Sequence, residues 1–80
     1  MDVRLAITGY KCADGKYGAT LVFTSFSGQP AKFRHMDLPC FVALDAISAK
    51  THVLSEVSKV IKDRYDKNIN EIEISFRGSW

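Results

Sequence analysis

Hydrophobic and polar residues alternate along residues 3–8 (VRLAIT), which predicts a strand with one buried face. Residues 19–26 (ATLVFTSF) are rich in β-branched and aromatic side chains and are apolar on both faces, so they predict a second strand. Between them, residues 9–18 (GYKCADGKYG) contain three glycines and an Asp-Gly pair, which indicates a loop or hairpin connection. A turn at residues 27–30 (SGQP) precedes residues 31–36 (AKFRHM), which can return as a third strand.

The hydrophobic period changes near Pro39. Proline fixes φ, lacks an N–H donor and is best tolerated in the first turn of a helix, so we predict that a helix begins at residues 37–39 and stops at about Asn68. Lysine and arginine residues near its end complement the helix dipole. Apolar residues recur at helical spacing and predict one buried stripe. The stripe comprises Phe41, Ala43, Leu44, Ala46, Ile47, Val53, Leu54, Val57, Val60 and Ile61.

After the helix, residues 72–76 (IEISF) alternate again and predict a final, half-exposed strand. The order is therefore strand, strand, strand, helix, strand. A helix between the third and fourth strands favours a parallel last strand, with the first strand as its natural neighbour. We predict a two-layer α+β fold, in which a four-stranded mixed sheet carries one long amphipathic helix on one face. The other face of the sheet is expected to be open to water or to a partner.

Length and composition indicate one small domain. The chain has 80 residues and a mass of 9.0 kDa, so a single domain spanning residues 1–80 is expected. A hydrophobic fraction of 46% and a net charge of +2 are ordinary for a globular protein. Neither a signal peptide nor a run long enough to cross a membrane is visible, so we expect a soluble, cytoplasmic protein without membrane partners.

Cysteine and histidine residues give little sign of catalysis or metal binding. Cys12 and Cys40 lack the paired spacing of a zinc site, and His35 and His52 do not supply it. We expect both cysteines to be free thiols in a reducing cytoplasm, with Cys40 in the first turn of the helix and His52 on its solvent face. The alternative is a disulfide between them, which requires Cα atoms within about 7 Å. The chain also lacks the GxSxG, GxGxxG and P-loop motifs. We therefore expect no enzyme activity, no catalytic residues, no metal and no cofactor.

Two stretches resemble the first half of the ribonuclease H-like fold. They are residues 5–23 (LAITGYKCADGKYGATLVF), in which Tyr17-Gly18-Ala19 matches a G-Y-G-A-like opening of the second strand, and residues 56–79 (EVSKVIKDRYDKNINEIEISFRGS). The resemblance implies a truncated member of the family. Its chemistry requires several carboxylates around two divalent metals.

This chain departs from that family pattern at the metal-binding positions. The strand-one aspartate would fall at Thr8 or Gly9, and the strand-four aspartate near Phe76 or Arg77. Only Glu56 matches a carboxylate of the family. A degenerate metal-dependent nuclease is therefore the least favoured of the functions considered.

The glycine-rich loop and the third strand suggest a nucleic-acid surface. Aromatic rings can stack on bases and cations can neutralise phosphates. The residues concerned are Tyr10, Lys11, Lys16, Tyr17, Lys32 and Arg34. The alternative is that the tyrosines cover the sheet edge and the lysines keep that edge from aggregating.

The second strand favours a protein partner instead. Val22 and Phe26 point to the face opposite Leu21 and Phe23, and one helix cannot cover both faces. Near the C-terminus, Arg77 and Trp80 are of types enriched at binding hot spots, although Trp80 can also fold back over the core.

The leading hypothesis is a small non-catalytic protein-binding module. It could act as an inhibitor or adaptor on a larger assembly, as many phage or mobile-element proteins do, or as a homodimer. Nucleic-acid binding is the alternative.

Overall fold

The computed structural model describes residues 2–26 and 30–80, and within them the predicted element order is confirmed. Residues 27–29 of the predicted turn lie outside the described residues. The elements are β1 (Asp2–Lys11), η1 (Ala13–Gly15), β2 (Tyr17–Phe26), β3 (Lys32–Phe41), α1 (Ala46–Tyr65), η2 (Ile69–Glu71) and β4 (Glu73–Gly78).

The four strands form one mixed sheet in the order β3-β2-β1-β4. β1 and β2 form an antiparallel hairpin, β2 and β3 are antiparallel, and β4 lies parallel to β1, with Leu5 opposite Ile74. This confirms the parallel placement of the last strand beside the first. The crossover through α1 allows it, because parallel neighbours cannot be joined by a tight turn.

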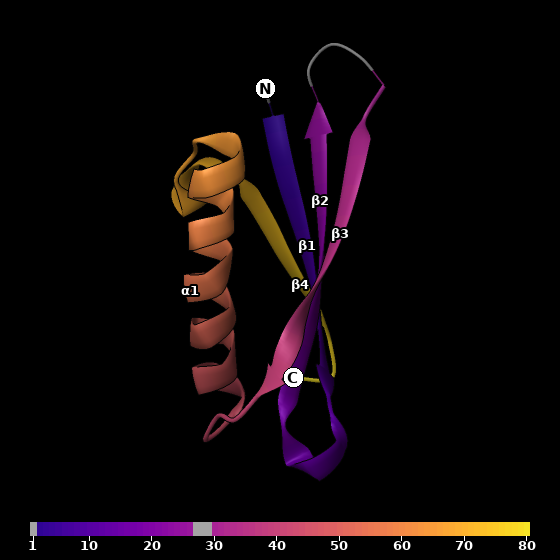
Figure 1. Cartoon of the computed structure of the whole chain (residues 1–80), viewed down its shortest axis with the longest axis vertical. Helices are drawn as coiled ribbons and strands as arrows, with labels where there is room; N and C mark the ends of the chain where they lie inside the picture. The colour runs from indigo at the N-terminus through magenta and orange to yellow at the C-terminus, as the bar shows by residue number, and fades with distance from the viewer. Residues whose placement is uncertain (1, 27–29) are drawn as a thin grey trace.

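α1 covers one face of the twisted sheet (Figure 1). Alternate residues of β1 and β2 point toward it and are buried together with one stripe of α1. The buried cluster consists of Val3, Leu5, Ile7, Ala19, Leu21, Phe23, Val53, Val57 and Ile61. Each large apolar side chain removed from water here contributes roughly 1.5–3 kcal/mol before entropy costs. The residues between them on the strands point to the other face, which no element of the described chain covers.

The start of the helix differs from the prediction. β3 continues through Pro39 to Phe41, and α1 begins only at Ala46. Proline is tolerated in β3 because β3 is an edge strand, where a missing N–H need not break a ladder bond. Asp45 then caps the helix, with its carboxylate accepting a hydrogen bond of 2.8 Å from the Ser48 N–H. Phe41 therefore belongs to β3.

The late helix start exposes two residues of the predicted buried stripe. Leu44 and Ile47 are 95% and 77% exposed, so their predicted burial is wrong. Leu44 lies in the connection between β3 and α1, and Ile47 lies in the first helical turn. Their positions in the sequence continue the helical spacing of the buried stripe, but the structure does not bury them in the core.

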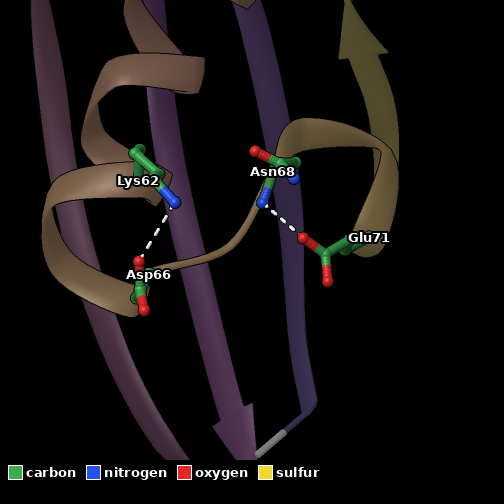
Figure 2. Close-up of polar contacts among 4 residues, drawn as sticks. All are labelled: Lys62, Asp66, Asn68 and Glu71. Atoms are coloured by element: carbon green, nitrogen blue, oxygen red, sulfur yellow. Dashed lines mark hydrogen bonds and ion pairs between the residues drawn. The ribbon is translucent and has the colours of Figure 1, made fainter.

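The end of the helix also comes earlier than predicted. α1 ends at Tyr65, and Asp66 adopts the left-handed conformation (φ 52°) with its N–H on the Lys62 carbonyl. Figure 2 shows the Lys62 ammonium donating to the Asp66 carboxylate at 3.1 Å. Asn68 instead caps η2, and its N–H donates to the Glu71 carboxylate at 2.8 Å (Figure 2). These caps turn the chain back toward β4.

The Asp45 cap makes helix stability depend on pH. The Ser48 N–H, followed by the Ser48 hydroxyl, lowers the pKa of the Asp45 carboxyl below its ordinary 3.8. A lowered folded-state pKa adds stability above the unfolded value, and that stability is lost as pH falls through the folded value. In thermal melts, Asp45→Asn should melt below wild type at about pH 7, and the difference should shrink as the pH falls below 3.8 and through the lowered folded-state pKa. Ser48→Ala keeps the backbone donor and should retain most of the pH dependence. A pH-independent difference between wild type and Asp45→Asn would contradict the assignment.

Candidate interaction surfaces

The connection between β3 and α1, together with the first turn of α1, carries the most exposed aliphatic side chains of the described residues. Val42, Leu44 and Ile47 are 81%, 95% and 77% exposed, and we call these three residues the apolar loop. Figure 1 shows this connection projecting at the end of the molecule where α1 begins. Folding stability does not account for exposing three such side chains together, because water contact with them is unfavourable.

Both ends of the apolar loop are fixed by the fold. On the β3 side, the Phe41 ring packs on Tyr17 and on His52, with centroids 6.2 Å and 4.1 Å apart. His52 is exposed, as predicted, but its ring stacks on Phe41. On the helix side, the Asp45 cap sets the first turn. Both flanks of the apolar loop are therefore anchored in the fold.

A disulfide between Cys12 and Cys40 fixes the same region, so the prediction of free thiols is wrong. The bond joins the turn after β1 to the end of β3, two residues before Val42, with Cα atoms 6.3 Å apart. Strand β2 passes beneath it: a Cβ at Gly18 would lie 2.8 Å from the Cys12 sulfur. Glycine is needed at this position because the disulfide and the Tyr10 ring occupy the space above it.

Trp80 folds back over the sheet, one of its two predicted alternatives. Its Nε1–H donates to the Tyr10 carbonyl at 2.9 Å and to the Gly18 carbonyl at 3.2 Å. The indole also lies edge-on to Tyr17, with centroids 5.6 Å apart, and occupies the space above Gly9. Tyr17 is itself buried. Both aromatic residues are therefore engaged in packing within the chain.

The structure does not bring together the six residues of the predicted nucleic-acid patch. Tyr10, Lys11, Lys16 and Tyr17 lie at or near the β1–β2 turn, but Tyr10 points to the open face while Lys11 stacks on Tyr17, with its Nζ 3.7 Å from the ring centroid. Lys32 and Arg34 lie on the first half of β3. Lys32 is opposite Ser25 and Arg34 opposite Phe23, eight and six residues along β2 from Tyr17, so the two groups are roughly 20–26 Å apart at about 3.3 Å per residue.

The open face of the sheet is more polar than the sequence suggested. Val22 and Phe26 do point to it, and both are half-buried. The Phe26 ring lies beneath the Arg4 guanidinium at 5.3 Å, and Arg4 pairs with Glu73 at 3.1 Å. The remaining side chains on this face are largely hydroxyl or charged groups. They include Thr8, Thr20, Thr24, His35, Asp37, Ser75 and Arg77.

Two of the positions that the resemblance assigns to metal ligands come together, but with other side chains. Thr8 and Arg77 are direct neighbours across β1 and β4. A guanidinium beside a hydroxyl does not hold a cation. Glu56, on α1, lies 3.5 Å from the Lys59 ammonium. Within residues 2–26 and 30–80, no three His, Cys, Asp or Glu side chains are grouped so that they could hold a metal ion.

Comparison with family models, with curated proteins and with solved structures gave no match for this chain. Among the described residues, no helix combines the length and the apolar character that crossing a bilayer requires. We therefore infer the function from the surfaces described above.

The disulfide should contribute strongly to stability. It closes a loop of 28 residues, and the chain-entropy relation gives roughly 3–4 kcal/mol for a loop of that length. Cys12→Ser/Cys40→Ser should lose about this free energy of unfolding in urea titrations followed by Trp80 fluorescence. Wild type reduced with dithiothreitol should match the variant. A loss below about 1 kcal/mol in both would show that the bond constrains the chain little.

Proposed function

We propose that this chain is a non-catalytic protein-binding module that docks on a larger protein through the apolar loop. The observation that carries the proposal is the exposure of Val42, Leu44 and Ile47, at 81%, 95% and 77%. Contiguous exposed aliphatic groups of this kind mark interaction sites on soluble domains. Burying three such side chains would provide roughly 4–9 kcal/mol before the costs of association.

The exposure of the loop defines the partner. Val42, Leu44 and Ile47 are almost fully accessible to water, so the partner must supply an apolar surface that covers them. The Asp45 cap and the Cys12–Cys40 bond hold the loop before binding. Pre-organisation lowers the entropy lost on association and favours a specific complex. An inhibitor or adaptor acting on a protein assembly fits these properties.

Other functions find less support. The open face offers Val22, Phe26 and the exposed Phe33 among mostly polar groups, which makes it a weaker docking face and a weaker dimer interface than the apolar loop. The split of the cationic residues between two ends of β2 disfavours one continuous nucleic-acid site. The ribonuclease H-like resemblance stays a prediction, and Thr8 and Arg77 at its metal positions disfavour a nuclease.

The disulfide bears on where the protein would act. Disulfides persist in oxidising compartments and are rare in the reducing cytoplasm. The Cys12–Cys40 bond therefore favours an oxidising compartment over the cytoplasmic location expected from the sequence.

Site-specific photo-cross-linking in the native cells tests the proposal. Leu44 is replaced by a benzophenone amino acid, and Ser55, an exposed position on α1, serves as the matched site. Position 44 should give a discrete adduct with another protein, and position 55 should not. Excess wild-type protein should suppress the adduct, whereas excess Leu44→Ser protein should not. The variant should still fold, with a free energy of unfolding within about 0.5 kcal/mol of wild type.

Four results would overturn the proposal. The first three are the absence of an adduct at position 44, an adduct made only of two copies of this chain, and equal adducts at positions 44 and 55. A fourth is binding to phosphatidylcholine–phosphatidylglycerol vesicles that Leu44→Ser abolishes, because it would assign the loop to a lipid surface.

A further inference from the structure

The outer edge of β3 is a second surface that the apolar loop does not explain. β3 pairs with β2 on one side, and no element of the described chain pairs with its other side. Residues 32–35 are all exposed, unlike the central strands. An edge of this kind presents unpaired N–H and C=O groups that can accept another strand.

Two cations line the helix-facing side of this edge. Lys32 lies opposite Ser25 and Arg34 opposite Phe23, so both side chains are on the face that α1 covers. Together with Tyr65 at the end of α1, they border a hollow of about 280 Å³. Neither Lys32 nor Arg34 forms an ion pair with any residue in 2–26 or 30–80. Their charges are thus free to meet an acidic group.

An aromatic ring marks the opposite side of the same edge. Phe33 lies opposite Thr24, on the open face, and is 68% exposed. Edge lysines alone are explained as protection against aggregation. Such protection does not account for an exposed phenylalanine between the two cations, because the ring favours association. The edge therefore combines a charged side and an apolar side.

Pro39 limits how far an added strand could extend. It has no N–H to donate, and the pairing between β2 and β3 is irregular between Tyr17 and Ala19, near the same place. Regular pairing is available along residues 32–38. A strand of about seven residues is typical of peptides that add to a sheet edge.

We propose that residues 32–38 of β3 bind an extended acidic segment of a partner protein by strand addition. Its backbone would pair with the free edge of β3. Side chains in an added strand alternate between faces, so acidic groups would lie beside Lys32 and Arg34, and apolar groups beside Phe33. The apolar loop follows the far end of β3, so one molecule could engage two sites. This inference is independent of the proposed function of the loop.

A synthetic eight-residue peptide that alternates glutamate and valine is the probe, and its affinity is measured by fluorescence anisotropy. We expect Lys32→Glu/Arg34→Glu to weaken binding at least tenfold and Phe33→Ala at least threefold. The matched control, Lys16→Glu/Lys59→Glu, changes net charge equally at exposed lysines elsewhere and should alter affinity less than twofold. Added salt should weaken binding, and circular dichroism should show that all variants are folded.

The backbone requirement is tested with the same peptide N-methylated at alternate residues, in both possible frames. One frame should lose at least tenfold in affinity, because its donors are blocked. Equal binding of both frames would overturn strand addition. The proposal also fails if a lysine–valine peptide binds as tightly, if Lys32→Glu/Arg34→Glu binds normally, or if no binding occurs at millimolar peptide. Tighter binding of a single-stranded oligonucleotide would assign the edge to nucleic acid, and self-association through β3 would assign it to a second copy.

Discussion

The packing of α1 on one face of the sheet is the interaction on which the rest of the structure depends. Val53, Val57 and Ile61 complete a core with alternate residues of β1 and β2. Since α1 is the one α-helix of the described chain, it can cover only one face of the sheet. The open face, the β3 edge and the apolar loop lie outside the contact between α1 and the sheet. A small domain buries a limited fraction of its surface, and these uncovered surfaces are where this chain can bind a partner.

The parts of the fold that follow a clear period could be predicted from the sequence. The alternation of residues 3–8 and 72–76 identified β1 and β4, and the helical stripe from Val53 to Ile61 identified the buried side of α1. The mixed sheet followed from the element order together with the alternation of the first strand, because a helix between two strands favours a parallel last strand. These features rest on local pattern combined with general rules of connection.

The start of α1 could not be predicted from period, because Phe41, Leu44 and Ile47 continue the helical spacing by coincidence. The pairing of β3 with β2 determines the structure here instead of the helical spacing, and it extends the strand beyond Pro39 to Phe41. The one local signal was Asp45, three residues before Ser48, which is the arrangement of a helix cap. The disulfide left no such signal, because Cys12 and Cys40 are brought together only by the twisted sheet.

The elongated shape of the molecule separates the two candidate surfaces. The Cα trace extends 43 × 20 × 17 Å, and the apolar loop and the first residues of β3 lie toward opposite ends of the sheet. The loop is apolar and anchored at both flanks, whereas the edge is cationic and offers backbone groups. The two surfaces therefore bind different features of a partner, and an assembly that engages both would bind more tightly than through either one alone.

Carbene footprinting with mass spectrometry separates the exposed apolar loop from the buried core, because it labels side chains according to their contact with water. We expect strong labelling of Val42, Leu44 and Ile47, together with protection of Leu21, Val53 and Val57. Protection of Leu44 and Ile47 to the level of Val53 would contradict this expectation, because these residues would then belong to the buried stripe of a longer helix.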